Sequence, residues 1–168
     1  MGIKRIKYIL PVVFAVLLVA GCTRECLENK NSIGLAGFYD SATGRKISVQ
    51  GVTVYGAGAP NDSVIVENGQ SVSRVYLPMS INRNMIQFVF HYTQKEIENI
   101  RYNDTLTVNY TPVPYFASKE CGAMYMYEIQ DFSYTTHLMD SVAIPVMKIT
   151  NKDVETIKLF MRTTSADK

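Results

Sequence analysis

The fold is decided by the stretch TLTVNY at Thr105–Tyr110. Large apolar residues alternate in it with short polar ones, so Leu106, Val108 and Tyr110 share one face of an extended chain. This period of two is typical of a β-strand that has one face in the core and the other toward solvent. The sequence therefore predicts a half-buried strand at this position.

Similar runs occur on both sides of this strand. Met85–Tyr92 alternates in the same way, and Ala123–Phe132 carries large apolar side chains on both faces, which is typical of a central strand. The other predicted strands are Ile33–Tyr39, Lys46–Tyr55, Val64–Val66, Val72–Leu77, Val142–Ile149 and Thr156–Arg162.

Turn and breaker residues separate these runs. Asp40–Gly44 has the composition of a tight turn, with Gly44 available for a positive φ, and Gly51 is predicted to form a bulge. Pro112 and Pro114 are predicted to break the strand ladder, which suits an edge or a crossover. A capping box at Thr93-x-x-Glu96 predicts one or two helical turns over residues 94–100.

The strand count defines the fold class. Eight or nine short strands with frequent turns and at most one short helical turn predict an all-β domain, either a sandwich or a barrel. We favour a β-sandwich of immunoglobulin-like character over residues 33–168. Because the chain has no Trp, the core marker of true immunoglobulin domains is missing and the topology stays open.

The N-terminal 21 residues are predicted to be a signal peptide that is removed. A basic segment precedes 13 apolar residues, Tyr8–Ala20, which are too few for a spanning helix. The stretch Leu18–Cys22 resembles the lipobox of bacterial lipoproteins, so Cys22 is expected to be lipidated and residues 22–32 to form a tether. The alternative is a permanent N-terminal membrane helix.

Removal of residues 1–21 changes the charge of the chain. The formal charge falls from +2 to −1, because three of the 17 basic residues are lost and all 15 acidic ones remain. No basic surface for nucleic acid is left. Thr23 after the lipidated cysteine, by resemblance to Gram-negative sorting, favours the outer membrane. The neighbouring residues lack the acidic run associated with surface export in some Bacteroidetes lipoproteins, which favours a position facing the periplasm.

The two remaining cysteines form an even pair in an exported, oxidising compartment, so a Cys26–Cys121 disulfide is predicted. Two buried free thiols are the alternative. A bonded Cys26 leaves only residues 23–25 free, a reach of about 10–14 Å. The domain would then lie close to the membrane, with the Cys121 loop at its base.

Several short segments together resemble an uncharacterised family of small Bacteroidetes lipoproteins. They are the lipobox, Gly37–Asp40, Thr43–Gly44, Val54–Gly56, Asp104–Thr107, Tyr115–Phe116, Glu120–Gly122 and Thr135–His137. The resemblance covers most of the chain after the signal peptide. It implies a lipid-anchored domain of unknown function, and it assigns no catalytic residue.

Chemistry-bearing residues are sparse. His91, His137, Cys26 and Cys121 lie on separate segments without metal-ligand spacing, so neither a metal nor another cofactor is expected. There is no nucleophile elbow and no phosphate loop. A small periplasmic hydrolase or thiol-dependent enzyme, using His137 with Asp140 or a free Cys121, is kept as the alternative to a non-enzyme.

Two further patterns suggest interactions with partners or modifying enzymes. Aromatic residues at positions 110, 115, 116, 125 and 127 form either core or an exposed platform for a glycan or peptide. Triplets of Asp, Ser or Thr, and an aliphatic residue or Ala resemble O-glycosylation acceptors, although Asp and Ser also mark strand boundaries. The candidate acceptors are Ser41, Ser63, Thr105 and Ser141.

The expected function is accordingly a lipid-anchored, non-catalytic binding or structural module of the cell envelope. Its expected partners are the membrane, through the lipid, and an envelope protein or a glycan.

Overall fold

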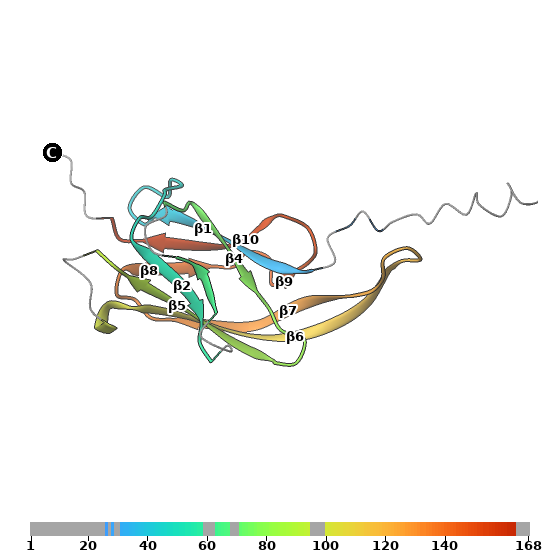
Figure 1. Cartoon of the computed structure of the whole chain (residues 1–168). Helices are drawn as coiled ribbons and strands as arrows, with labels where there is room; N and C mark the ends of the chain where they lie inside the picture. The colour runs from blue at the N-terminus through green and yellow to red at the C-terminus, as the bar shows by residue number, and fades with distance from the viewer. Residues whose placement is uncertain are drawn as a thin grey trace, which may run out of the picture.

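The computed structural model describes residues 26, 28, 31–58, 63–67, 71–94 and 100–163. Over these residues the chain forms ten β-strands and one 3-10 turn, Ile100–Tyr102, which confirms the predicted all-β sandwich (Figure 1). The signal peptide, Cys22 and most of the predicted capping-box turn lie outside the described residues. No helix in the described part is long and apolar enough to cross a membrane.

The smaller sheet has four strands in the order β4-β1-β10-β8. Its strands are β1 (Ile33–Asp40), β4 (Arg74–Pro78), β8 (Met139–Ala143) and β10 (Glu155–Met161). The two central strands, β1 and β10, run parallel, whereas the outer pairs are antiparallel. The strand nearest the N-terminus and the strand nearest the C-terminus therefore hold this sheet together.

The larger sheet has six strands in the order β3-β2-β5-β6-β7-β9, all antiparallel. Its strands are β2 (Val52–Gly56), β3 (Val64–Val66), β5 (Met85–Tyr92), β6 (Asp104–Ser118), β7 (Gly122–Tyr134) and β9 (Lys148–Ile149). The chain passes back and forth between the two sheets, as it does in immunoglobulin-like sandwiches.

Three strand predictions need correction. The predicted strand at 142–149 is two strands in different sheets, because Pro145 lies in the crossing between β8 and β9 and cannot donate to a ladder. The strand predicted from Lys46 begins only at Val52, so Gly51, with φ of 63°, precedes it and is no bulge within it. β7 is covered on its outer edge only by the two residues of β9, so it is not a central strand over its whole length.

The prediction that the two prolines break the ladder is wrong. β6 continues through Pro112 and Pro114 and pairs with β7 as far as Ser118. The Tyr110 N–H points toward β5 and donates to the carbonyl of Asn84 at 2.8 Å. Because backbone groups two residues apart point the same way, the ring nitrogens of both prolines face the side where β5 has ended. The predicted edge position is correct, and the bonds to β7 are kept.

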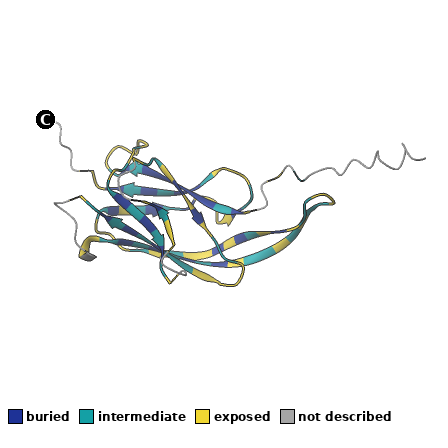
Figure 2. Ribbon diagram, viewed as in Figure 1, coloured by how far each residue is buried: buried dark blue, intermediate teal, exposed yellow. Residues whose placement is uncertain are grey.

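The core lies between the two sheets. Phe38 of the smaller sheet meets Phe90 of the larger one edge-to-face, with ring centroids 6.3 Å apart, and both side chains are fully buried. Leu106 and Val108, from the strand that decided the fold, lie in the same core. Figure 2 shows the buried residues concentrated in the body of the sandwich, while the far part of the β6–β7 hairpin is mostly exposed or half-buried.

The predicted turn at Asp40–Gly44 is also confirmed. Gly44 has a φ of 66°, in the left-handed region, and its N–H donates to the Asp40 carbonyl at 2.8 Å. The Asp40 carboxylate accepts hydrogen bonds from the backbone and hydroxyl of Thr43 and from the Thr163 hydroxyl. These bonds, first of all the one from Thr163, hold the pKa of Asp40 below its usual value.

Candidate functional site

The larger sheet ends in an arm, defined here as residues 111–126 of β6 and β7. β6 pairs with β5 only as far as Asn109, whereas it pairs with β7 to its last residue. Beyond Tyr110 the two strands therefore extend away from the body as a hairpin (Figure 1). Ser118 lies eight residue steps after Tyr110, which corresponds to about 27 Å of extended chain.

Two tyrosines fix the base of the arm. Tyr110 and Tyr127 pack edge-to-face with centroids 5.4 Å apart, and both are buried. The Tyr110 hydroxyl donates to the Ser80 carbonyl at 2.9 Å and accepts from the Ser80 N–H at 3.1 Å. Burial raises the pKa of Tyr127, whose hydroxyl reaches the Met79 carbonyl at 3.5 Å. The loop after β4 is thereby fastened to the arm.

A disulfide fastens the tip of the arm. Cys26 is bonded to Cys121, with Cα atoms 4.7 Å apart, in the loop that joins β6 and β7. This confirms the predicted pair, and the alternative of two free thiols is wrong. The Ser32 hydroxyl also donates to the Tyr125 carbonyl at 2.5 Å. The segment before β1 is therefore held against the arm at two points.

The aromatic residues predicted as one cluster divide between core and surface. Tyr110 and Tyr127 are core, whereas Phe116 is 72% exposed and Tyr125 38% exposed. Tyr115 is half-buried beside the Met124 sulfur, 3.8 Å from its hydroxyl. Of the residues expected to form an aromatic platform, only Phe116 and Tyr125 on the arm are exposed. A cleft of about 350 Å³ opens beside it, lined by residues 31–33, 78, 79, 81, 123–125 and 127.

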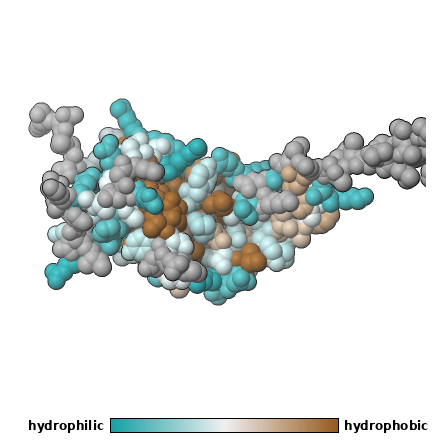
Figure 3. Space-filling model, in the orientation of Figure 1, coloured by the Kyte–Doolittle hydropathy of each residue, from teal (hydrophilic) through white to brown (hydrophobic). Residues whose placement is uncertain are grey.

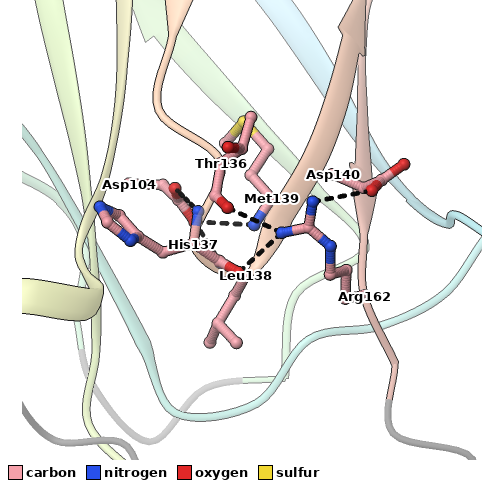
Figure 4. Close-up of polar contacts among 7 residues, drawn as sticks. All are labelled: Asp104, Thr136, His137, Leu138, Met139, Asp140 and Arg162. Atoms are coloured by element: carbon pink, nitrogen blue, oxygen red, sulfur yellow. Dashed lines mark hydrogen bonds and ion pairs between the residues drawn. The ribbon is translucent and has the colours of Figure 1, made fainter.

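The opposite end of β6 is organised around Asp104, whose side chain is fully buried (Figure 4). Its carboxylate accepts the backbone N–H groups of three consecutive residues, His137, Leu138 and Met139, at 2.7–2.9 Å. Two hydroxyl groups complete the set, one of them from Tyr92 at 2.9 Å and the other from Thr135 at 3.0 Å. Burial beside this carboxylate raises the pKa of Tyr92. The Asp104 cluster, as we call these groups, joins β5, β6 and the loop from β7 to β8.

Arg162 secures the same loop from outside. Its Nη1 donates to the carbonyls of Thr136 and His137 at 2.7 and 2.8 Å, and its Nη2 lies 2.9 Å from Asp140 Oδ1 (Figure 4). The candidate pair His137 and Asp140 is not brought together. The His137 imidazole points away from Asp140, whose carboxylate is paired with the guanidinium. Cys121 is engaged in the disulfide.

A groove of about 460 Å³ opens beside the Asp104 cluster. Polar and apolar side chains alternate along it: it is lined by residues 47–50, 92, 94, 138 and 161–163. Gln94 donates to the Gln50 carbonyl at 3.2 Å across one wall, and Arg162 lies at another. We call it the end groove. Its lining combines hydrogen-bonding groups with apolar side chains, which is the mixture that binding sites use.

His91 and the two cysteines, weighed as metal ligands, have other partners. His91 Nδ1 lies 2.9 Å from the Asn103 side-chain oxygen, and the cysteines are bonded to each other. Among the described residues, no three His, Cys, Asp or Glu side chains are grouped to hold a metal ion. The central role of Asp104 was missed by the sequence analysis. Its one visible signal was an acidic residue placed directly before an alternating strand.

The candidate glycosylation sites differ in accessibility. Ser63 is exposed just before β3, whereas Ser41, Thr105 and Ser141 are half-buried. Asp104, the acidic residue that precedes Thr105, is fully buried and hydrogen-bonded. Ser63 is therefore the most accessible of the four predicted acceptors in the folded chain. Glycosylation at each of them stays a prediction.

Comparison with known proteins identifies a family for most of the chain. Residues 51–161 match DUF6452, a family of unknown function. The matched region ends at the last residue of β10 and leaves out β1, although β1 lies between β4 and β10 in the smaller sheet. No curated protein and no solved structure matches the chain.

Proposed function

We propose that this chain, which belongs to the DUF6452 family, is a lipid-anchored envelope protein and acts as a non-catalytic binding or structural module. In this proposal it is a lipoprotein of the Bacteroidetes type, attached through Cys22 to the outer membrane and facing the periplasm. An envelope protein or a glycan is its partner, and nucleic acid is not.

The observation that carries the proposal is the disulfide between Cys26 and Cys121. Structural disulfides persist in exported proteins, because the cytosol keeps thiols reduced. The bond lies four residues after the cysteine of the predicted lipobox, so the same short segment combines an export signal, an acylation site and an oxidised pair. Each of the three points to the cell envelope.

The end groove is the proposed binding site. It opens beside the Asp104 cluster, at the end of β6 that is opposite the disulfide, so an anchor at the arm leaves it accessible. Gln50, Gln94 and Ser48 offer hydrogen-bonding groups, and Ile47 and Val49 offer apolar surface. This mixture suits the hydroxyls and ring faces of a glycan, or a short polar peptide. A hydrolase or thiol enzyme is the alternative, but Asp140 is paired with Arg162 rather than His137, and Cys121 is bonded to Cys26.

The anchor is tested by the intact mass of the mature protein, made in a Gram-negative host. We expect a chain that begins at Cys22 and carries acyl groups in the membrane fraction, and a Cys22→Ala variant without them. A mature chain without acyl groups in the soluble fraction would contradict the anchor. The same spectrum tests glycosylation, because any further mass should disappear in Ser63→Ala if that site is used.

The binding role is tested by crosslinking in cells followed by recovery of the full chain. A Ser48→Trp substitution should fill the end groove and remove the specific partner. Ser133→Trp, on an exposed position of β7 outside the groove, is the matched control and should keep it. Equal recovery with both variants would refute the groove as the site. Catalytic turnover by the purified domain would refute a non-catalytic role.

A further inference from the structure

We propose that the tip of the arm is a lipid-contacting site, in which Phe116 enters the headgroup region of the bilayer while the arm holds the sandwich body off the membrane. This inference rests on the lipid anchor proposed above and adds a second contact to it. Three observations support it: the position of the disulfide, the exposure of the arm residues and the chemistry of the free strand edge.

The disulfide limits how far the tip can move from the anchor. Residues 23–25 separate Cys22 from Cys26, so the two Cα atoms are at most about 14 Å apart. Cys26 is bonded to Cys121, in the loop between β6 and β7. An acyl chain at Cys22 therefore keeps this loop at or near the membrane surface, whatever the orientation of the body.

The residues at the tip suit a membrane interface. Phe116 is the most exposed large apolar residue of the described chain, at 72%, and its cross-strand partner Ala123 is exposed as well. Pro114 and Tyr125 form the next pair on the same face, also exposed. Moderately hydrophobic tan atoms gather at this end of the molecule in Figure 3. Aromatic residues concentrate at the headgroup level of membranes, where one part of the ring is dry and another is wet.

The free edge of the arm does not suit the main alternative, an added strand from a protein partner. Along this edge, Pro112 and Pro114 stand where N–H groups would otherwise point outward. Strand addition depends on a row of such donors. The two prolines interrupt that row, so the face and tip of the arm remain as its contact surfaces, and these surfaces suit lipid.

The arm is also built to keep its direction. β6 and β7 stay paired from the body to the tip, and the Tyr110–Ser80 hydrogen bonds fasten the base. A tip at the membrane then places the body about 27 Å further out along the strands. The short tether alone suggests a domain that lies close to the bilayer, whereas this arrangement brings only the tip of the arm to it. The end groove faces away.

The test uses the absence of Trp from the chain. Phe116→Trp places a single fluorescent reporter at the tip, and Tyr102→Trp places one at an exposed site near the start of β6 as the matched control. The lipidated mature protein is bound to vesicles of phosphatidylethanolamine and phosphatidylglycerol that contain brominated acyl chains. We expect the Phe116→Trp signal to shift to the blue and to be quenched at least about threefold more than the control.

Each outcome decides one part of the proposal. Equal quenching at both positions in membrane-bound protein would overturn the arm contact and leave the lipid anchor standing. A chain without acyl groups that does not bind vesicles would overturn both. Tyr125→Trp provides a second reporter on the same face, should the first variant fold poorly. Adding Cys26→Ser and Cys121→Ser to Phe116→Trp should reduce quenching to the control value; unchanged quenching would exclude the tether as its cause.

Discussion

The two ends of β6 are held in place by different means. At its start, Asp104 is fully buried and accepts five hydrogen bonds. At its end, the strand leaves the core and its loop is held by the covalent bond to Cys26. Hydrogen bonds fix structure well where water is excluded, because an unmade bond is then costly. In the arm only Met124 is buried among the described residues, so few hydrogen bonds there are shielded from water, and the disulfide provides the constraint instead.

The different constraints at the two ends of β6 fit the two proposed roles, binding at the end groove and attachment at the arm. The buried network keeps the loop from β7 to β8, and with it one wall of the end groove, in a fixed position. The disulfide connects the arm to Cys26, four residues after the proposed anchor at Cys22. In the proposed function, the end with the groove would serve recognition and the end with the disulfide would serve attachment. Substitutions at the two ends of β6 test that contrast.

Replacement of Asp104 should disrupt the buried end most strongly. Asp104→Ala leaves three backbone N–H groups and two hydroxyls without their acceptor. Each orphaned buried group costs about 1–3 kcal/mol, so we expect a loss on the order of 5 kcal/mol in urea denaturation. Asp140→Ala removes an exposed ion pair with Arg162 and should cost less than about 1 kcal/mol. Similar losses for the two variants would contradict the contrast.

Removal of the disulfide should loosen the arm and leave the body folded. The cysteines lie 95 residues apart, and closing so long a loop stabilises by up to about 4.7 kcal/mol. Since residual structure reduces that figure, we expect Cys26→Ser with Cys121→Ser to lose about 3 kcal/mol. Hydrogen exchange should accelerate in residues 111–126 and stay slow at the N–H groups that bind Asp104. Uniform acceleration would show that the two ends are not independent.

A smaller change separates the base of the arm from its tip. Tyr110→Phe loses two hydrogen bonds with Ser80 and should cost about 1–2 kcal/mol. Tyr115→Phe is the matched control, because its hydroxyl contacts only the Met124 sulfur at 3.8 Å among the interactions seen here, and it should be close to neutral. Thermal denaturation of the two variants side by side provides the measurement. A neutral Tyr110→Phe would mean that Ser80 does not fasten the arm.

The smallest expected effect is a pH dependence in the smaller sheet, away from both ends of β6. Burial alone would raise the pKa of Glu155, but hydrogen bonds from Lys46 and Tyr39 hold it below its usual value. The stability it contributes is therefore present above its unfolded pKa and is lost as the pH falls through the folded one. The hydrogen bond to Glu155 also raises the pKa of Tyr39 to about 12. The stability that this Tyr39–Glu155 bond contributes is therefore lost as the pH rises from about 10 through 12.

Glu155→Gln measures that dependence directly. Urea denaturation between pH 3 and 6 should show a shallower fall in the free energy of unfolding for the variant than for the natural chain. Part of the slope should remain, because Asp40 also has a lowered pKa. An unchanged slope would show that the Glu155 contacts add no stability to the smaller sheet.

Much of the fold was accessible to local pattern analysis. The alternation at Leu106, Val108 and Tyr110 predicted which face of β6 enters the core, and all three side chains are buried. The cysteine pair was predicted from the number of cysteines, and the Asp40–Gly44 turn from its residue composition, and both are present in the structure. Pro112 and Pro114 were misjudged as a break. Their effect depends on which side of the strand carries a neighbour, and a single strand does not reveal that.

The sequence by itself determined the all-β fold class, most of the strands, the buried face of β6 and the cysteine partners, because each depends on residue type, short spacing or an even count of cysteines. Only the tertiary structure decided which distant residues these strands contact and which of their side chains stay exposed. Asp104 became the centre of a buried network through N–H groups more than 30 residues away, and Phe116 is exposed on the part of β6 that extends beyond its pairing with β5. The burial of a side chain and its hydrogen-bond partners depend on contacts between residues far apart in the sequence, and these contacts exist only in the assembled sheets.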